Sequence, residues 1–326
     1  MRSRPAPLRA EPRALPVDVL VIGNPTAGSG RARRRAAALV RHLERRGHRV
    51  ECFVTERAGD ARRRAAECEG RVDCIVAAGG DGTLNEVLNG LADPRRTPLV
   101  PMALGTANML ARELAIPNDP AALAALIEAA TVRRVDMGRL DGSRFLGVVG
   151  IGFDARVTEN VRHVRRGRLG YRGYVLPILR TLARYRPPRL AVRLDGGAPI
   201  ECALAIIGNL RCYGGVLRVT AAARCDSGHL DACLFRSASA VDLVRYSWPA
   251  FRGRLAANPR VVYRTATLIE VDAEGRVPVQ ADGDAWGATP IRIGIEPGVV
   301  PILAPGGVQV ERAAPDRAAS SGALSG

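Results

Sequence analysis

Three segments rich in glycine and hydroxyl side chains carry residues that could do chemistry in this chain. They read NPTAGSG at 24–30, GGDGTLNE at 79–86 and ALGTAN at 103–108. Glycine lets a backbone approach a ligand closely, and backbone N–H groups at the start of a helix attract phosphate. Any one segment could be an ordinary strand-to-helix turn. The three together favour a site that binds phosphate groups.

Asp81 is the residue that a simple phosphate site does not explain, because a carboxylate repels phosphate. A tight turn between Gly80 and Gly82 is one interpretation. The other is a divalent cation that Asp81 directs and that bridges polyphosphate oxygens. Thr83 could cap the following helix or donate to a phosphate. The two neighbouring glycine segments favour the second interpretation.

The elements that must position these segments alternate between strand and helix in the first half of the chain. Apolar runs typical of buried strands cover residues 17–24, 49–55, 73–80 and 98–106. Helical patterns follow them at 31–47, at 60–69, from Leu84 and in stretches up to Ala130. Such alternation predicts a parallel sheet covered on both faces, with ligands beyond the carboxyl ends of its strands.

The second half reads mostly as short strands separated by turn signals such as DGG, DSG and DGD. The expected strands are 132–140, 145–153, 189–195, 200–209, 217–222, 229–235, 260–266, 267–273, 277–284 and 289–295. Helical patterns interrupt them at 171–186 and 241–255. We therefore expect a Rossmann-like α/β domain at 17–131 and an antiparallel β-sandwich-like domain at 132–304, between disordered ends at 1–16 and 305–326.

Composition excludes several classes of function. The net charge is +16, and every one of the 48 residues counted as Lys plus Arg is arginine. Without lysine the chain cannot form a Schiff base, and it cannot carry the lysine of a P-loop. The positive charge favours an anionic partner, either nucleic acid, a phosphorylated ligand or an acidic membrane surface. Seven scattered cysteines without a C-x-x-C pair, and the lack of a long apolar run, are typical of a cytoplasmic protein.

The segment 161–190 contains nine arginines and no acidic residue, with tyrosine and aliphatic residues between them. A nucleic-acid patch and a plain solvated face are two possible interpretations. The third is a surface that binds anionic lipid, in which apolar side chains enter the headgroup boundary.

The glycine segments resemble, in order and spacing, those of the diacylglycerol kinase catalytic-domain family, which includes bacterial lipid kinases and sphingosine and ceramide kinases. The later sequences FLGVVGIGFDA, GNLRCYGG, DSGHLDACLF and QADGD are also similar to that family's signatures. The G-G-D-G-T element alone also resembles NAD kinases and, more loosely, phosphofructokinases. The later motifs favour the lipid kinases. For segment 161–190, this resemblance favours contact with a membrane over the other two interpretations.

The resemblance implies an ATP site in the cleft between the two domains. The positions that match the family's nucleotide contacts are Asn24, Pro25, Thr26, Ala27, Gly28, Thr55, Gly80, Asp81, Gly82, Thr83, Leu84, Asn85, Glu86 and Thr106. Mg²⁺ would bridge the ATP oxygens and would be directed by Asp81.

The resemblance also implies a general base near the end of the second domain. The family's D-G-E motif reads Asp282-Gly283-Asp284 here, so Asp284 replaces the usual glutamate and is one methylene shorter. Asp282 is the alternative base. Family members often hold a structural magnesium with an acid before a glycine. That acid is Ser227 in this chain, with Asp226 one residue earlier, so a metal at Asp226 and Ser227 is only weakly indicated.

Three functions remain open from the sequence. The first is an ATP-dependent kinase that phosphorylates diacylglycerol or a related lipid alcohol at the inner face of the membrane, with no nucleic-acid partner. The second is an NAD-kinase-like enzyme with a soluble acceptor. The third is a regulator that binds nucleotide or membrane without catalysis. Neither the acceptor lipid nor the oligomeric state can be predicted from these motifs.

Overall fold

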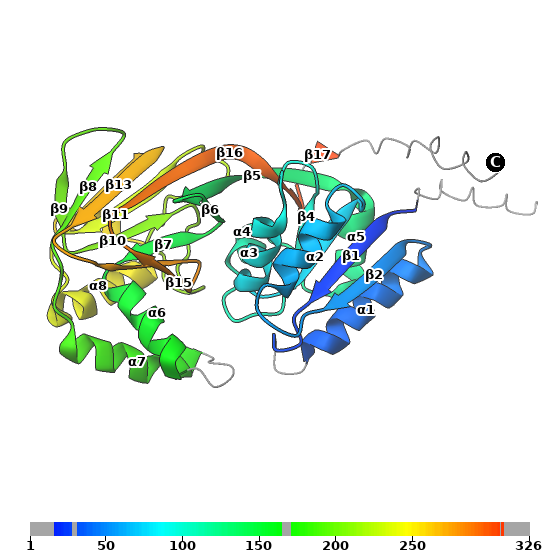
Figure 1. Ribbon diagram of the computed structural model, residues 1–326, viewed down its shortest axis with the longest axis horizontal. Helices are drawn as coiled ribbons and strands as arrows, with labels where there is room; N and C mark the ends of the chain where they lie inside the picture. Colours follow the sequence, from blue (N-terminus) through cyan, green and yellow to red (C-terminus); the bar gives the residue numbers. More distant parts are fainter. Residues whose placement is uncertain (1–15, 28–30, 165–170, 307, 310–326) are drawn as a thin grey trace, which may run out of the picture.

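The computed structural model describes residues 16–27, 31–164, 171–306 and 308–309. Four parallel strands form one end of its first sheet, and helices follow each strand in turn (Figure 1). The strands, in spatial order, are β2 (Arg49–Val54), β1 (Asp18–Gly23), β3 (Cys74–Gly79) and β4 (Leu99–Ala103). The helices are α1 (Arg31–Arg45), α2 (Asp60–Cys68), α3 (Asp81–Gly90), α4 (Met109–Glu113) and α5 (Pro120–Ala129).

The apolar sequence of the central strands explains their place in the sheet. All six residues of β3 are buried, because helices cover both faces of a parallel sheet and leave no polar side. Helix α1 presents Leu39 and Leu43, both fully buried, to the same apolar core as Leu20 and Ile22 of β1. These contacts confirm the expected α/β architecture. Helix α3 differs from expectation, because it begins at Asp81 rather than at Leu84.

The long strand β16 (Ile291–Leu303) joins the two halves of the protein. Near its end, Ile302 pairs in parallel with Leu99 of β4, while near its start Ile293 pairs antiparallel with Ile269. Figure 1 shows β16 arching along the top from one half to the other, with β5 beside it. The strands that complete this sheet are β5 (Thr131–Leu140), β6 (Ser143–Phe145), β8 (Leu190–Leu194), β9 (Ile200–Cys202), β13 (Leu268–Ala273) and β17 (Val308–Gln309).

A second sheet, antiparallel throughout, packs against the strands of the first sheet in the C-terminal half. Its strands, in spatial order, are β12 (Val261–Ala266), β11 (Leu230–Phe235), β10 (Leu204–Gly208), β7 (Val148–Ile151), β14 (Pro278–Ala281) and β15 (Asp284–Ala288). Alternate residues of β10 face opposite sides, so that Ala205 and Ile207 enter the core between the sheets. The expected β-sandwich domain is confirmed.

Helices cover the outer face of this second sheet. Leu204 and Ile206 of β10 point to that side and share an apolar cluster with Tyr246 and Ala250. The helices are α6 (Phe153–Val164), α7 (Tyr171–Arg184) and α8 (Ala240–Arg252), followed by the short 3-10 helix η1 (Leu255–Ala257). Within the described part of the chain, no helix is both long enough and apolar enough to pass through a bilayer.

Two local expectations for this half were wrong. Residues from Phe153 onward form α6, although the sequence indicated a strand ending there. The segment 217–222, expected as a strand, contributes only an isolated bridge between Tyr213 and Leu217.

Candidate functional site at the junction of the two halves

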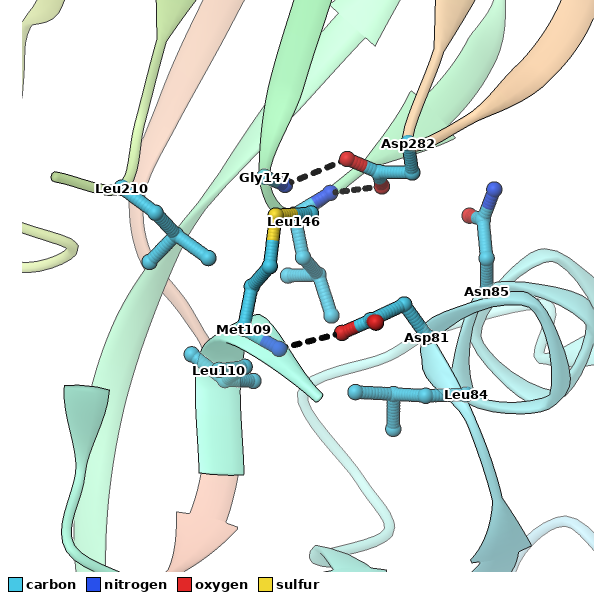
Figure 2. A pocket seen from close by; sticks show the side chains of 9 residues that line it. All are labelled: Asp81, Leu84, Asn85, Met109, Leu110, Leu146, Gly147, Leu210 and Asp282. Atoms are coloured by element: carbon cyan, nitrogen blue, oxygen red, sulfur yellow. Dashed lines mark hydrogen bonds between the residues drawn. The ribbon is translucent and has the colours of Figure 1, made fainter. Parts of the chain in front are cut away.

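A pocket lies where the first turns of α3 and α4 meet the second half of the chain. Figure 2 shows Asp81 on one side and Asp282 on the other. Its lining residues are Asp81, Leu84, Asn85, Met109, Leu110, Leu146, Gly147, Leu210 and Asp282. The pocket therefore brings together residues far apart in the sequence.

Asp81 is the first residue of α3, and its carboxylate holds the start of α4 in place. The backbone N–H of Asn108 donates to Oδ2 over 2.8 Å, and that of Met109 donates to Oδ1 over 2.6 Å (Figure 2 draws the second bond). Burial raises the pKa of Asp81, and these two bonds act against the rise. The acid that seemed out of place in a glycine turn thus links the second glycine segment to the third.

The two glycine segments touch through their backbones. A Cβ placed on Gly105 would lie 2.5 Å from the Cα of Gly80, which is closer than a side chain can approach. A Cβ on Gly79 would collide with the hydroxyl of Thr83. Glycine is therefore required at Gly79 and Gly105 by close packing, apart from any ligand.

Asp282 is partly buried and accepts three backbone hydrogen bonds from the second domain. The N–H of Leu146 donates to Oδ2 over 3.0 Å, and those of Gly147 and Val148 donate to Oδ1 over 2.9 Å and 2.8 Å. Burial raises the pKa of Asp282 to about 6, although these N–H groups oppose it. Because all three donors are backbone groups, Asp282 acts as an anchor for the turn between β14 and β15.

Asp284 lies two residues further along and is exposed. Its Oδ2 is 3.8 Å from the position that a Cβ on Gly82 would occupy. The turn that Asp282 anchors therefore presents Asp284 to the first turn of α3. The sequence did not separate the two acids, whereas the structure gives them different surroundings.

Behind this turn lies a buried chain of hydrogen bonds that the sequence did not indicate. Gln280, fully buried, donates from Nε2 to Oδ2 of Asp154 over 2.9 Å. The N–H of Gly283 donates to Oε1 of Gln280 over 2.7 Å. Burial raises the pKa of Asp154 to about 6, with the bond from Gln280 opposing the rise. The sequence signal for Asp154 was hidden, because it follows an apolar run that resembles one continuous strand.

The first glycine segment begins beside the second. Asn24 accepts at Oδ1 from the N–H of Thr26 (3.0 Å) and from its hydroxyl (2.7 Å), and Asn24 Nδ2 reaches Thr83 Oγ1 at 3.4 Å. Pro25 is exposed and Ala27 is buried. Gly28 lies outside the described residues.

The other positions that match nucleotide contacts have mixed surroundings. Thr55 is buried at the end of β2, and its hydroxyl lies 3.4 Å from the carbonyl oxygen of Gly23. Leu84 is buried, and its side chain packs in the apolar core while it also lines the pocket. Glu86 accepts from the N–H of Gly59 (3.1 Å). Asn85 accepts from Asn89 Nδ2 (2.8 Å), and Thr106 is exposed.

Asp226 and Ser227 lie elsewhere, beside two guanidinium groups. Oδ2 of Asp226 is 3.1 Å from Arg133, and Oδ1 is 3.1 Å from Arg224. The hydroxyl of Ser227 donates to the carbonyl of His229 over 3.2 Å. Two arginines already neutralise the carboxylate, so these residues do not fit a cation, and we place none there.

Only part of the arginine-rich segment 161–190 can be placed, because residues 165–170 lie outside the described chain. In the described part of α7, Leu176 and Leu179 are exposed, and so are Arg180 and Arg184.

Comparison with known families and proteins gives a consistent result. The model of the diacylglycerol kinase catalytic domain matches residues 18–140, and the model of the YegS C-terminal NAD kinase beta sandwich-like domain matches residues 147–304. A protein of Bacillus subtilis (strain 168) named diacylglycerol kinase is 29% identical over 274 residues, which cover 83% of this chain and 90% of the relative.

Two further similarities agree with this match. A Staphylococcus haemolyticus (strain JCSC1435) protein with the same name is 29% identical over 273 residues, covering 83% of each chain. The solved structure of a proposed diacylglycerol kinase from Bacillus anthracis str. Sterne superposes with a TM-score of 0.77 at 28% identity. That superposition covers 91% of this chain and 98% of the other.

Proposed function

Because the chain belongs to the diacylglycerol kinase catalytic-domain family, a family of lipid kinases, we propose that it phosphorylates the hydroxyl of a lipid alcohol. ATP is the proposed donor of the γ-phosphoryl group, and diacylglycerol or a related lipid is the proposed acceptor. Residues 17–131 would bind the nucleotide, and residues 132–304 would bind the acceptor. The facing positions of Asp284 and of Gly82 in the first turn of α3 carry this proposal.

In the proposed reaction, Asp284 accepts the proton of the acceptor hydroxyl as its oxygen attacks the γ-phosphorus and the bond to ADP breaks. Asp284 suits this role better than Asp282, because Asp284 is exposed and faces the first turn of α3, whereas the carboxylate of Asp282 holds three backbone N–H groups of its own domain. Positioning and electrostatics dominate phosphoryl transfer, so the rigid turn that Asp282 anchors contributes by fixing the place of the base.

Mg²⁺ fits this proposal with Asp81 as its protein ligand, direct or through water. Across the described residues, no three acidic, histidine or cysteine side chains gather as a complete metal site. Mg²⁺ commonly uses one or two carboxylates together with substrate phosphates, so a single aspartate at a phosphate site suits it. When bound, the ion would neutralise charge on the phosphoryl oxygens.

The phosphates of ATP would be held by the glycine segments and by arginine. The helix that starts at Asp81 is ten residues long, and the start of a helix favours negative charge. The chain has no lysine, so arginine is its permanently charged side chain for contact with the phosphates.

We place the reaction at the cytoplasmic face of an anionic membrane, where the acceptor hydroxyl lies in the headgroup zone. The exposed leucines and arginines of α7 support contact with such a surface. The protein would then be peripherally attached, with no nucleic-acid partner.

The decisive test is a radiolabelled-ATP reaction with the full chain and Mg²⁺. Acceptors are diacylglycerol, ceramide and sphingosine in anionic vesicles, and NAD in solution. We expect label in at least one lipid. Label in NAD alone would replace this function with that of an NAD-kinase-like enzyme.

A second test addresses a purely regulatory role. Asp81→Ala and Asp284→Ala should each lose lipid phosphorylation, while Asp226→Ala, which lies outside the proposed centre, serves as the control. If Asp81→Ala and Asp284→Ala phosphorylate lipid as fast as the parent protein does, the assigned centre is wrong. If the parent phosphorylates neither lipid nor NAD yet binds ATP, the regulatory role is supported.

A further inference from the structure

Helix α8 carries an apolar stripe on its outer face. The exposed fractions of Val241, Val244, Trp248 and Phe251 are 57%, 60%, 64% and 55%. Their spacing of three and four residues places them along one side of a helix. Trp248 and Phe251 stack with their ring centroids 6.0 Å apart. Such large side chains rarely gather on a surface that meets only water.

The opposite face of α8 fixes the orientation of this stripe. Tyr246 and Ala250 are buried in the cluster that covers the second sheet. Asp242 accepts a 2.6 Å bond from Ser239 and a 2.7 Å bond from Arg260. Ser239 also caps the helix by accepting from the N–H of Asp242. Since these contacts hold the inner face, the stripe cannot turn inward.

Positive charge borders the stripe. Arg245 and Arg252 are exposed, and the guanidinium of Arg252 lies over the ring of Trp248 at 5.2 Å. No ion pair among the described residues involves either arginine, and Asp242, the only acid of α8, belongs to the buried face. The outer face of α8 therefore combines apolar surface with uncompensated positive charge, which complements an anionic surface with an apolar interior.

The neighbouring helix has the same character. Leu176 and Leu179 of α7 are 54% and 55% exposed. Tyr185, directly after α7, packs on the same cluster as Tyr246 and Ala250 of α8. Figure 1 shows both helices at the same end of the C-terminal half. Two helices on one side of the protein thus present aliphatic or aromatic residues together with arginine.

We propose that α8 is a membrane-docking helix, which inserts Val241, Val244, Trp248 and Phe251 into the headgroup boundary of an anionic bilayer. Arg245 and Arg252 would pair with lipid phosphates at the same depth. This proposal rests on the proposed lipid-kinase function, which is what would bring the protein to a membrane. It adds a second membrane contact to the one proposed for α7. No covalent step is involved.

Vesicle co-sedimentation tests α8 without nucleotide or diacylglycerol. The full chain is mixed with vesicles of phosphatidylcholine, with or without phosphatidylglycerol. We expect Trp248→Ala to bind anionic vesicles about tenfold more weakly than the parent protein. Val244→Ser is matched with Val54→Ser, which removes a valine of similar exposure (49%) from β2. Only Val244→Ser should lose binding. Equal binding by Trp248→Ala and the parent would overturn the proposal.

Fluorescence gives a direct readout of insertion. The chain has two tryptophans, so Trp286→Phe leaves Trp248 as the only one. We expect the emission of Trp248 to shift to the blue with anionic vesicles and to be quenched by lipids brominated on the acyl chain. An unchanged spectrum with bound vesicles would show that another surface docks.

Two further measurements separate this proposal from its rivals and from the proposed function. If sedimentation without vesicles shows an oligomer that Trp248→Ala dissociates, the stripe is a protein interface and the proposal fails. With short-chain diacylglycerol dispersed as monomers, Trp248→Ala should turn over as fast as the parent, while its turnover in vesicles falls. If the parent phosphorylates no lipid at all, the proposed function fails, and vesicle binding still decides the role of α8.

Discussion

Asp284 Oδ2 lies 3.8 Å from the point where a Cβ on Gly82 would stand, so the two halves of the protein meet at a position that lacks a side chain. The distance allows a methyl group in ordinary contact, whereas a longer side chain on Gly82 that points toward Asp284 would push against its carboxylate. Gly82→Ala should therefore fold and retain activity, whereas Gly82→Leu should displace Asp284. We expect Gly82→Leu to lose about 100-fold in kcat with an unchanged Tm. Equal kcat values for the two variants would show that this approach has no part in catalysis.

A second prediction concerns the carboxylate of Asp284 and the length of its side chain. Asp284→Asn keeps the shape but cannot accept a proton, so kcat should fall by about 10²- to 10⁴-fold while KM for ATP changes little. Asp284→Glu restores the carboxylate on a longer arm, as in the related D-G-E motif, and should retain far more activity than Asp284→Asn. Steady-state kinetics with vesicle lipid measure both. Equal losses in the two variants would mean that the carboxylate is not the base.

Asp81 should contribute to stability before any ligand binds. Its carboxylate accepts the N–H groups of Asn108 and Met109, and Asp81→Ala leaves both donors without this partner. We expect the free energy of unfolding to fall by about 1–3 kcal/mol. Urea denaturation in the absence of nucleotide and Mg²⁺ measures this, with Asp226→Ala as a control outside the pocket. A stability equal to that of the parent would leave Asp81 with a role in ligand binding alone.

Gln280 should act by positioning the turn that carries Asp284. Gln280→Leu removes its bonds to Asp154 and to the N–H of Gly283, and a small displacement of Asp284 should lower kcat by about 100-fold. Gln280→Glu can still accept from Gly283, but its carboxylate repels that of Asp154.

Protonation of this pair should relieve the repulsion, so Gln280→Glu should recover part of its relative activity as the pH falls. A pH profile of kcat for both variants distinguishes positioning from general damage. If the two variants share one profile, Gln280 does not position the turn through Asp154.

Asp154 should make stability depend on pH. Burial raises the pKa of Asp154 from the ordinary 3.8 of an aspartate to about 6, so the folded protein binds more protons than the unfolded chain between these values. The free energy of unfolding should therefore fall as pH rises from about 4 to about 6 and level off above, by at most about 3 kcal/mol from this group. Asp154→Asn removes the titration. Urea titrations at several pH values should show a flatter curve for the variant, and parallel curves would contradict the assignment.

The three glycine segments could be recognised from sequence because each follows an apolar strand of a parallel sheet. The hydrogen-bond partners of Asp81 could not be predicted from the sequence. Asn108 and Met109 donate backbone N–H groups, and any residue type could do so. Helix α3 was expected to begin later, since Gly82 is a poor helix former, yet the close packing of Gly80 on Gly105 fixes the chain there.

The two acids around Gly283 could not be told apart from their types alone. Only the fold decides that Asp282 meets three N–H groups while Asp284 faces the other domain. The length of strand β16 was also underestimated, because Pro297 and Gly298 are residue types typical of the end of a strand. In the structure they lie in an irregularity of the pairing with β5, after which the strand continues to Leu303.

The path of β16 also has a consequence for how the protein is made. Strand β4 is synthesised early, but one of its two neighbours in the sheet, β16, starts only at Ile291. During synthesis, the N-terminal half must therefore remain with one side of a buried apolar strand uncovered until β16 has emerged from the ribosome. An uncovered strand of this kind recruits other strands. A chain cut before Ile291 should accordingly aggregate during translation, even though every glycine segment of its first half is complete.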